Sequence, residues 1–173
     1  MANLGSLREL YDHMRWADAI VWRAALATPN ATTDPFLRER LWHIHAVQRA
    51  FLSVWRQQSP DFRELSTFSE LTAIARWARD YYDEVRPYLD SVAEDALENL
   101  VIMPWAGRLT KRFGREPAPT TLRETMLQVP MHSTYHRGQV NARLRDLGGE
   151  PPLVDYIAWL WQGKPPAEWP EER

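Results

Sequence analysis

The chain has 173 residues, with 21 basic and 23 acidic side chains and a formal net charge of −2. This length is typical of one domain, so we expect a single domain over residues 1–173. The near-balanced charge gives no global positive field, which argues against nucleic acid as a partner. The chain contains no cysteine, which excludes disulfides, thiolate metal sites and a cysteine nucleophile.

Targeting and membrane signals are absent from the sequence pattern. The first ten residues, MANLGSLREL, lack the basic-then-apolar order of a secretory signal peptide. No run approaches the roughly 20 apolar residues that a transmembrane helix needs. Together with the missing disulfide chemistry, these patterns predict a cytoplasmic protein with no membrane partner.

Two amphipathic helices are predicted in the N-terminal part. Residues 4–26 place apolar side chains at helical spacing, and no Pro or Gly interrupts them after Gly5. The segment ATPNATTDP then breaks the pattern. Asp34 followed by Pro35 predicts an N-cap and the first residue of a second helix, which continues to about residue 57.

A third periodic segment begins near Ser69 and carries apolar residues on one side as far as Val85. Pro87 is expected to kink or end this helix. Residues 93–119 contain repeated Pro and Gly and are predicted to be irregular, with two short extended pieces. This stretch is long enough to permit a crossover connection.

A fourth helix begins at a capping-box pattern, in which Thr120 or Thr121 precedes Glu124, and runs to the Gly148-Gly149 pair. The aromatic-rich residues 149–166 then predict a short helical segment that packs over an open end of the core. The expected fold is therefore all-α. It is a four-helix bundle with an irregular segment between helices three and four and a short C-terminal helical cap.

Two of the five histidines, His132 and His136, are four residues apart on the fourth helix. With His136 at zero and about 100° per residue, Val129 lies near +20° and Val140 near +40°, so both histidines face the bundle. Buried imidazoles need polar partners, and one shared metal ion would satisfy both. Satisfaction by Tyr, Asp or water is the alternative that the spacing leaves open.

A functional metal needs a third ligand from another helix. His43 and His45 border the apolar arc of the second helix on opposite sides, about 100° to either side of Ile44, so periodicity does not choose between them. His13 borders the first apolar stripe and is expected to be a surface or structural residue. Four residues could supply a further ligand: His13, Asp18, Glu124 and Asp155.

These residues carry a family resemblance. The string HSTYHRGQ at residues 132–139, with the helix end LRDLGGEPP, resembles the HxxxHRGQ signature of the DinB/YfiT-like family of four-helix-bundle metalloproteins. The WAD of residues 16–18 and LWHIHAVQRAFL of residues 41–52 resemble two further stretches of that family, so the similarity spans most of the chain. The resemblance implies an up-down-down-up helix order and often a homodimer. It also implies His43, His132 and His136 as metal ligands, with His45 as the fallback for the first.

The resemblance further implies a divalent transition metal, for which zinc, nickel, iron and manganese are candidates. Some members of the superfamily are thiol-dependent transferases. The first functional hypothesis is a metal-dependent S-transferase that activates a low-molecular-weight thiol for attack on an electrophile. Because the chain has no cysteine, the sulfur would belong to the small molecule. The alternative is a non-catalytic metal-binding module in stress response or assembly.

Further roles are predicted for four residues near the two histidines of the fourth helix. Gln139 could orient a ligand or bind substrate, and Arg143 could meet an anionic substrate group or pair with an acidic residue. Gly138 is costly in a helix, which suggests that a neighbouring helix approaches the backbone there. Pro130 removes an N–H, so the carbonyl of Met126 loses its usual partner, and we expect a kink that shapes packing or aims a ligand.

Overall fold

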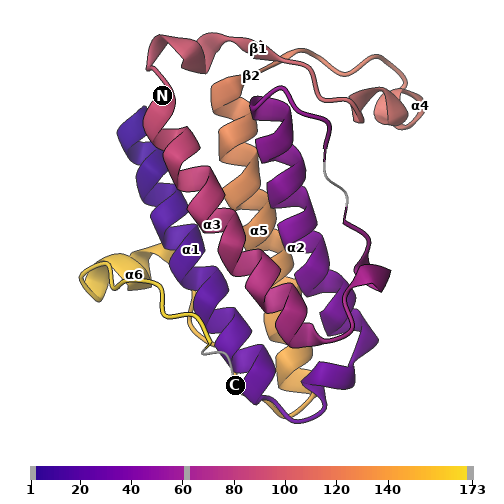
Figure 1. Cartoon of the computed structure of the whole chain (residues 1–173), viewed down its shortest axis with the longest axis vertical. Coiled ribbons are helices and arrows are strands. Elements are labelled where there is room, and N and C mark those ends of the chain that lie inside the picture. The colour runs from indigo at the N-terminus through magenta and orange to yellow at the C-terminus, as the bar shows by residue number, and fades with distance from the viewer. Residues whose placement is uncertain (1–2, 61–62, 171–173) are drawn as a thin grey trace.

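The computed structural model describes residues 3–60 and 63–170. It confirms the all-α expectation, because long helices form a bundle and the strand structure within these residues is limited to one small pair (Figure 1). The helix α2 packs against α3 and α5, and α1 packs against the same two helices. The bundle helices are α1 (Leu4–Ala27), α2 (Pro35–Trp55), α3 (Leu71–Ser91) and α5 (Leu122–Asp146).

The helix directions give the up-down-down-up order that the family resemblance implies. In Figure 1, α1 and α5 run one way along the bundle, and α2 and α3 run the other way. The parallel pair α2 and α3 needs a crossover, and the connection that contains the 3-10 helix Leu65–Thr67 supplies it by returning along the bundle. The possible crossover at residues 93–119 is therefore wrong, since that stretch joins the antiparallel helices α3 and α5 at one end of the bundle.

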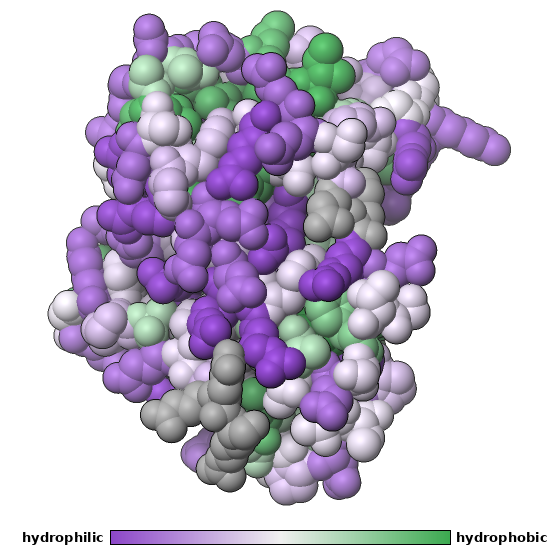
Figure 2. All heavy atoms as spheres, viewed as in Figure 1, coloured by the Kyte–Doolittle hydropathy of each residue, from purple (hydrophilic) through white to green (hydrophobic). Residues whose placement is uncertain are grey.

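The stretch between α3 and α5 contains the two short extended pieces that the sequence predicts. The strand β1 (Leu100–Val101) pairs antiparallel with β2 (Thr120–Thr121). The helix α4 (Thr110–Phe113) lies between them in the sequence. The ring of Trp105 lies 5.3 Å from that of Phe51 on α2, which ties this segment to the bundle. Figure 2 shows apolar atoms gathered at this upper end of the molecule.

Two helix starts form as the sequence predicts. At α2, the Asp34 carboxylate accepts a hydrogen bond of 2.8 Å from the backbone N–H of Leu37, and Pro35 occupies the first turn. At α5, Glu124 accepts from the backbone N–H of Thr121 at 2.7 Å, and Thr121 Oγ1 accepts from the N–H of Glu124 at 3.2 Å. These caps fix where the two helices that carry the histidines begin.

Both internal prolines are accommodated without ending a helix. Pro87 lies inside α3, which continues to Ser91, so it does not end that helix as one alternative predicted. Pro130 lies inside α5, where the carbonyl of Met126 accepts a hydrogen bond of 3.1 Å from the Tyr11 hydroxyl. The freed carbonyl is therefore satisfied by α1, and it does not serve to orient a ligand.

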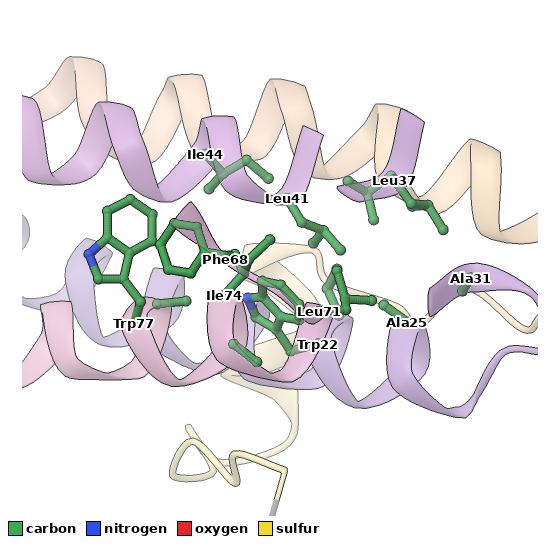
Figure 3. Packing of buried hydrophobic residues seen from close by; sticks show 14 of the residues in the cluster. Trp22, Ala25, Ala31, Leu37, Leu41, Ile44, Phe68, Leu71, Ile74 and Trp77 are labelled. Carbon is green, nitrogen blue, oxygen red and sulfur yellow. The ribbon is translucent and has the colours of Figure 1, made fainter. Parts of the chain in front are cut away.

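The hydrophobic core divides into two main clusters along the bundle axis. Figure 3 shows one of them, where Trp22 of α1 lies among side chains of α2 and α3. The second surrounds Met126 and Trp55 towards the opposite end. A smaller cluster joins Trp16 to Trp159 of α6 (Tyr156–Trp161), so the C-terminal segment covers the flank of α1 rather than an open end.

Among the described residues, no helix combines the length and the apolar character that crossing a bilayer requires.

Candidate metal centre

Three histidines from two helices meet at the contact between α2 and α5. Each of His43, His132 and His136 offers a ring nitrogen, and these three atoms lie within 4.8 Å of one another. The ring centroid of His43 lies 5.2 Å from that of His132 and 4.6 Å from that of His136. The extensive packing of α2 on α5 therefore brings together the three residues that the family resemblance implies as ligands.

The spacing of the two histidines on α5 suits one shared ion. Their Nε2 atoms are 3.1 Å apart. Two nitrogens bound to one tetrahedral zinc ion at about 2.0 to 2.1 Å would be separated by roughly 3.3 Å. A cation could thus be held by small adjustments of side-chain torsions, without movement of the helix.

Hydrogen bonding leaves His136 with a nitrogen suited to a metal. Its Nδ1 lies 2.8 Å from Gln139 Oε1, an acceptor, so Nδ1 carries the hydrogen and Nε2 keeps its lone pair. In His132, Nδ1 is buried and has no hydrogen-bond partner among the described residues. An ion held between the two Nε2 atoms would not contact this Nδ1, so the fit of the cluster to a metal rests on the positions of the Nε2 atoms.

Burial also favours the neutral imidazole in two of these residues, His43 and His132. Burial, followed by the effects of His136 and His43, lowers the pKa of His132 to about 4. Burial and then His136 likewise lower the pKa of His43. Neutral imidazole is the form that binds metals, so lone pairs are available at pH 7. The residues present fit a divalent transition-metal ion, and their binding of it stays a prediction.

His45, the fallback ligand, lies apart from the cluster. It is buried, its Nε2 accepts a hydrogen bond of 2.9 Å from Trp22 Nε1, and its Nδ1 donates to Gln48 Oε1 at 2.7 Å. Both nitrogens are therefore engaged within the bundle. His43 and His45 do face opposite sides of α2, and the packing of α2 on α5 is what distinguishes them.

A buried polar network lies behind the histidines. Asp18 and Arg137 form an ion pair of 2.7 Å, with side chains only 2% and 1% exposed. The other carboxylate oxygen of Asp18 accepts hydrogen bonds from Gln48 Nε2 at 2.8 Å and from the Tyr82 hydroxyl at 2.5 Å. Gln48 Nε2 also lies 3.1 Å from the Ser133 hydroxyl. Four helices thus contribute to one connected set of polar groups.

This network bears on the orientation of α5. Ser133 and Arg137 directly follow His132 and His136 in the sequence, so groups anchored to α1 and α2 hold the turns that carry the two histidines. The Asp18–Arg137 pair was not predicted from the sequence. The signal was available as a carboxylate within the apolar stretch WADAIVW of the first helix, since a charge buried there needs a partner.

The proposed extra ligands lie outside the cluster. Asp18 is engaged by Arg137, and Glu124 caps α5. His13 is buried and its Nε2 lies 2.9 Å from the carbonyl of Val154, which fits a structural role. Within residues 3–60 and 63–170, the three-histidine group has no fourth His or carboxylate inside the same 4.8 Å limit.

The structure agrees with one of the alternatives predicted for Arg143 but not with the prediction for Gly138. Arg143 pairs with the helix cap Asp34, with Nη2 2.6 Å and Nε 3.1 Å from one carboxylate oxygen, so the acidic-partner alternative is the one the structure contains. The expectation for Gly138 is wrong. Within 4 Å, a Cβ added there would meet no atom of another helix in the described part of the chain, so no neighbouring helix explains this glycine.

Cavity volume does not mark this site. Hollows of about 700 and 650 Å³ are lined by other residues, the first around Arg23 and Arg76 and the second around Tyr88 and Leu100. None of the three histidines lines either hollow. The chemistry of the donor set, rather than the size of a cavity, identifies the candidate centre.

Gln139→Leu is expected to weaken metal binding by roughly 10- to 100-fold, because the hydrogen bond that fixes the tautomer of His136 is lost. The affinity is measured by competition with a coloured chelator. Gln128→Leu is the matched control, since Gln128 is exposed on the same helix. Equal affinities of the two variants would refute an orienting role for Gln139.

A sequence model of the DinB family matches residues 1–171 of the chain. No curated protein sequence gives a significant match to it.

Proposed function

The chain belongs to the DinB family, and from that premise we propose that it is a metal-dependent S-transferase acting with a low-molecular-weight thiol. The observation that carries the proposal is the cluster of His43, His132 and His136, whose ligand atoms lie within 4.8 Å. Three imidazole ligands leave coordination positions open for a substrate. A site closed by four protein ligands would instead favour a purely structural ion.

A divalent cation bound there would supply Lewis-acid character that lowers the pKa of a thiol. The partial exposure of His43 and His132 gives a small molecule access to the cluster, while His136 is buried. In the proposed reaction the thiol loses its proton to solvent, and its sulfur forms a bond to an electrophilic carbon. The leaving group departs with the electron pair of the broken bond.

A panel of small thiols tests this function against a chromogenic electrophile. The purified protein is assayed with Zn²⁺, Ni²⁺, Fe²⁺ or Mn²⁺ and after treatment with a chelator. We expect turnover that needs both a thiol and a metal and that is lost in His132→Ala. Turnover that is unchanged by chelation, or absent with every thiol and metal, would refute the transferase proposal.

One observation favours a second candidate, a non-catalytic metal module. An ion shared by His43 of α2 and His132 of α5 would cross-link two helices of the bundle. This candidate predicts that metal binding raises the unfolding temperature of the protein. It also predicts that adding a thiol leaves the absorption spectrum of a bound cobalt ion unchanged. The transferase proposal predicts that a thiol does change that spectrum.

A further inference from the structure

The segment between β1 and β2 projects from one end of the bundle. In Figure 1 it extends sideways from the upper end, and α4 lies at the far right, away from the long helices. The rings of Trp105 and Phe51, 5.3 Å apart, attach the segment to α2. Most of residues 106–119 are exposed beyond that contact. This end of the molecule therefore offers its side chains to a partner.

The projecting segment is strongly basic. Residues 100–121 contain four basic residues and one acidic residue, Glu116, although the whole chain has a net charge of −2. Glu116 accepts a hydrogen bond of 3.0 Å from the Thr110 hydroxyl. Four exposed basic side chains have no ion pair or hydrogen bond within the described residues: Arg108, Lys111, Arg112 and Arg115. Positive charge is thus concentrated at one end of an otherwise acidic chain.

Large apolar side chains are exposed among these charges. Leu100 and Ile102 lie two residues apart at the strand β1, so they point to the same side, and Ile102 is 88% exposed. Leu109 and Phe113 are four residues apart in helical structure, and Phe113 is 54% exposed. Exposed apolar side chains that gather in one segment are typical of an interaction surface.

Exposed apolar side chains on α5 and α6 lack this setting. Met131 and Tyr135 have no exposed basic residue within four positions in the sequence. Near Trp161 of α6, the basic residue that follows is Lys164, and it forms an ion pair of 2.8 Å with Glu9. The combination of apolar groups with unpaired cations is therefore a property of the projecting segment and not of the surface in general.

This combination matches the chemistry of an anionic lipid surface. Basic side chains are attracted to anionic headgroups, and apolar side chains enter the boundary between headgroups and acyl chains. A polynucleotide would attract the cations but would leave an aliphatic side chain such as Ile102 exposed to water. A symmetric contact with a second copy of the chain would place the same cations opposite one another, which is unfavourable.

We propose that residues 100–115, here called the basic tip, bind the protein to an anionic lipid surface. The four cations contact the headgroups, while Ile102 and Phe113 enter the apolar boundary. Such a contact needs neither a membrane-spanning helix nor a signal peptide, the two patterns behind the sequence prediction of no membrane partner. The inference goes beyond the proposed function and does not depend on metal binding.

Co-sedimentation of the full chain with lipid vesicles tests this proposal. The vesicles contain either phosphatidylcholine alone or phosphatidylcholine with about 30% phosphatidylserine. We expect binding to the anionic vesicles that weakens as salt is added, because salt screens the attraction between exposed charges and headgroups. Equal binding to both kinds of vesicle, or binding to neither, would overturn the proposal.

The double variant Lys111→Gln, Arg112→Gln is expected to weaken vesicle binding roughly 30-fold, since each cation near an anionic surface contributes about a factor of five. The control Arg76→Gln, Arg145→Gln removes the same charge from exposed arginines of α3 and α5, which also lack an ion pair within the described residues. We expect little change in the control. Equal weakening by both double variants would overturn the proposal, since net charge alone would then explain the binding.

Ile102→Ser tests the apolar contact and is expected to weaken vesicle binding about tenfold. Ile157→Ser is the matched control, because Ile157 is 47% exposed on α6, and it should bind like wild type. Circular dichroism shows whether each variant is folded. A duplex DNA fragment tests the polynucleotide alternative. DNA binding that is lost in Lys111→Gln, Arg112→Gln, together with unchanged vesicle binding in Ile102→Ser, would overturn the assignment of a lipid surface.

Discussion

His132→Ala and His136→Ala are each expected to reduce bound metal from about one ion per chain to less than roughly a tenth of that amount. The two Nε2 atoms are 3.1 Å apart, so either substitution removes one of two ligand atoms that are close enough to share an ion. Two remaining imidazoles rarely retain a divalent ion through purification. Elemental analysis of protein purified without chelators or metal-affinity resin measures the content.

His45→Gln is the control that decides between the two candidate histidines of α2. It changes the same residue type on the same helix, but His45 hydrogen-bonds to Trp22 and Gln48 away from the cluster. We expect it to retain metal, and circular dichroism shows whether it is folded. A folded His45→Gln without metal, or metal retained in His132→Ala, would contradict the assignment of His43, His132 and His136.

Thermal denaturation gives a second readout of the same prediction. A ligand that binds only the folded state stabilises it by about 2.7 kcal/mol when its free concentration is 100 times the dissociation constant. Wild type and His45→Gln should therefore unfold at a higher temperature with metal. His136→Ala should show no such shift.

The helices could be predicted from sequence because their signals are local. Apolar periodicity, the cap at Asp34 and the capping box of Thr121 and Glu124 depend on residues within one or two turns. The location of the crossover could not be predicted in this way. Whether a long connection returns along the bundle depends on where the next helix packs, and residues 93–119 contain no local signal for that.

The same distinction between local and long-range signals applies to the candidate site. The inward face of His132 and His136 followed from the spacing of Val129 and Val140 on the same helix. The choice of His43 over His45 depends on which neighbour packs against each side of α2.

Asp18→Asn is expected to destabilise the protein by about 3 to 5 kcal/mol, because it leaves the charge of Arg137 buried without a counterion. The pair is 2.7 Å long and almost wholly enclosed. Urea denaturation of the metal-free protein measures the free energy of unfolding. Asp12→Asn is the matched control, since Asp12 lies on the same helix in an ion pair with Arg86 of 2.8 Å, and both side chains are about half exposed.

The control should change stability by no more than about 0.5 kcal/mol, because exposed ion pairs contribute little. A similar small loss in Asp18→Asn would show that the buried pair is not important for folding.

The pH dependence of stability gives a further check on the Asp18–Arg137 pair. Burial raises the pKa of Asp18, but Arg137 and the hydrogen bonds from Tyr82 and Gln48 lower it, and the net shift is downward. The stabilisation is therefore present above the ordinary carboxyl pKa and is lost as pH falls through the lower value of the folded state.

Removing both charges of the Asp18–Arg137 pair tests separately whether the pair stabilises the fold and whether it positions the histidines. The double variant Asp18→Leu, Arg137→Met has no unpaired charge, so we expect it to recover much of the stability that Asp18→Asn loses. It also removes the contacts that hold the turn of α5 carrying His136. If the network positions the histidines, the folded double variant should bind metal more weakly than wild type. Wild-type metal affinity in that variant would show that the network stabilises the bundle without orienting the site.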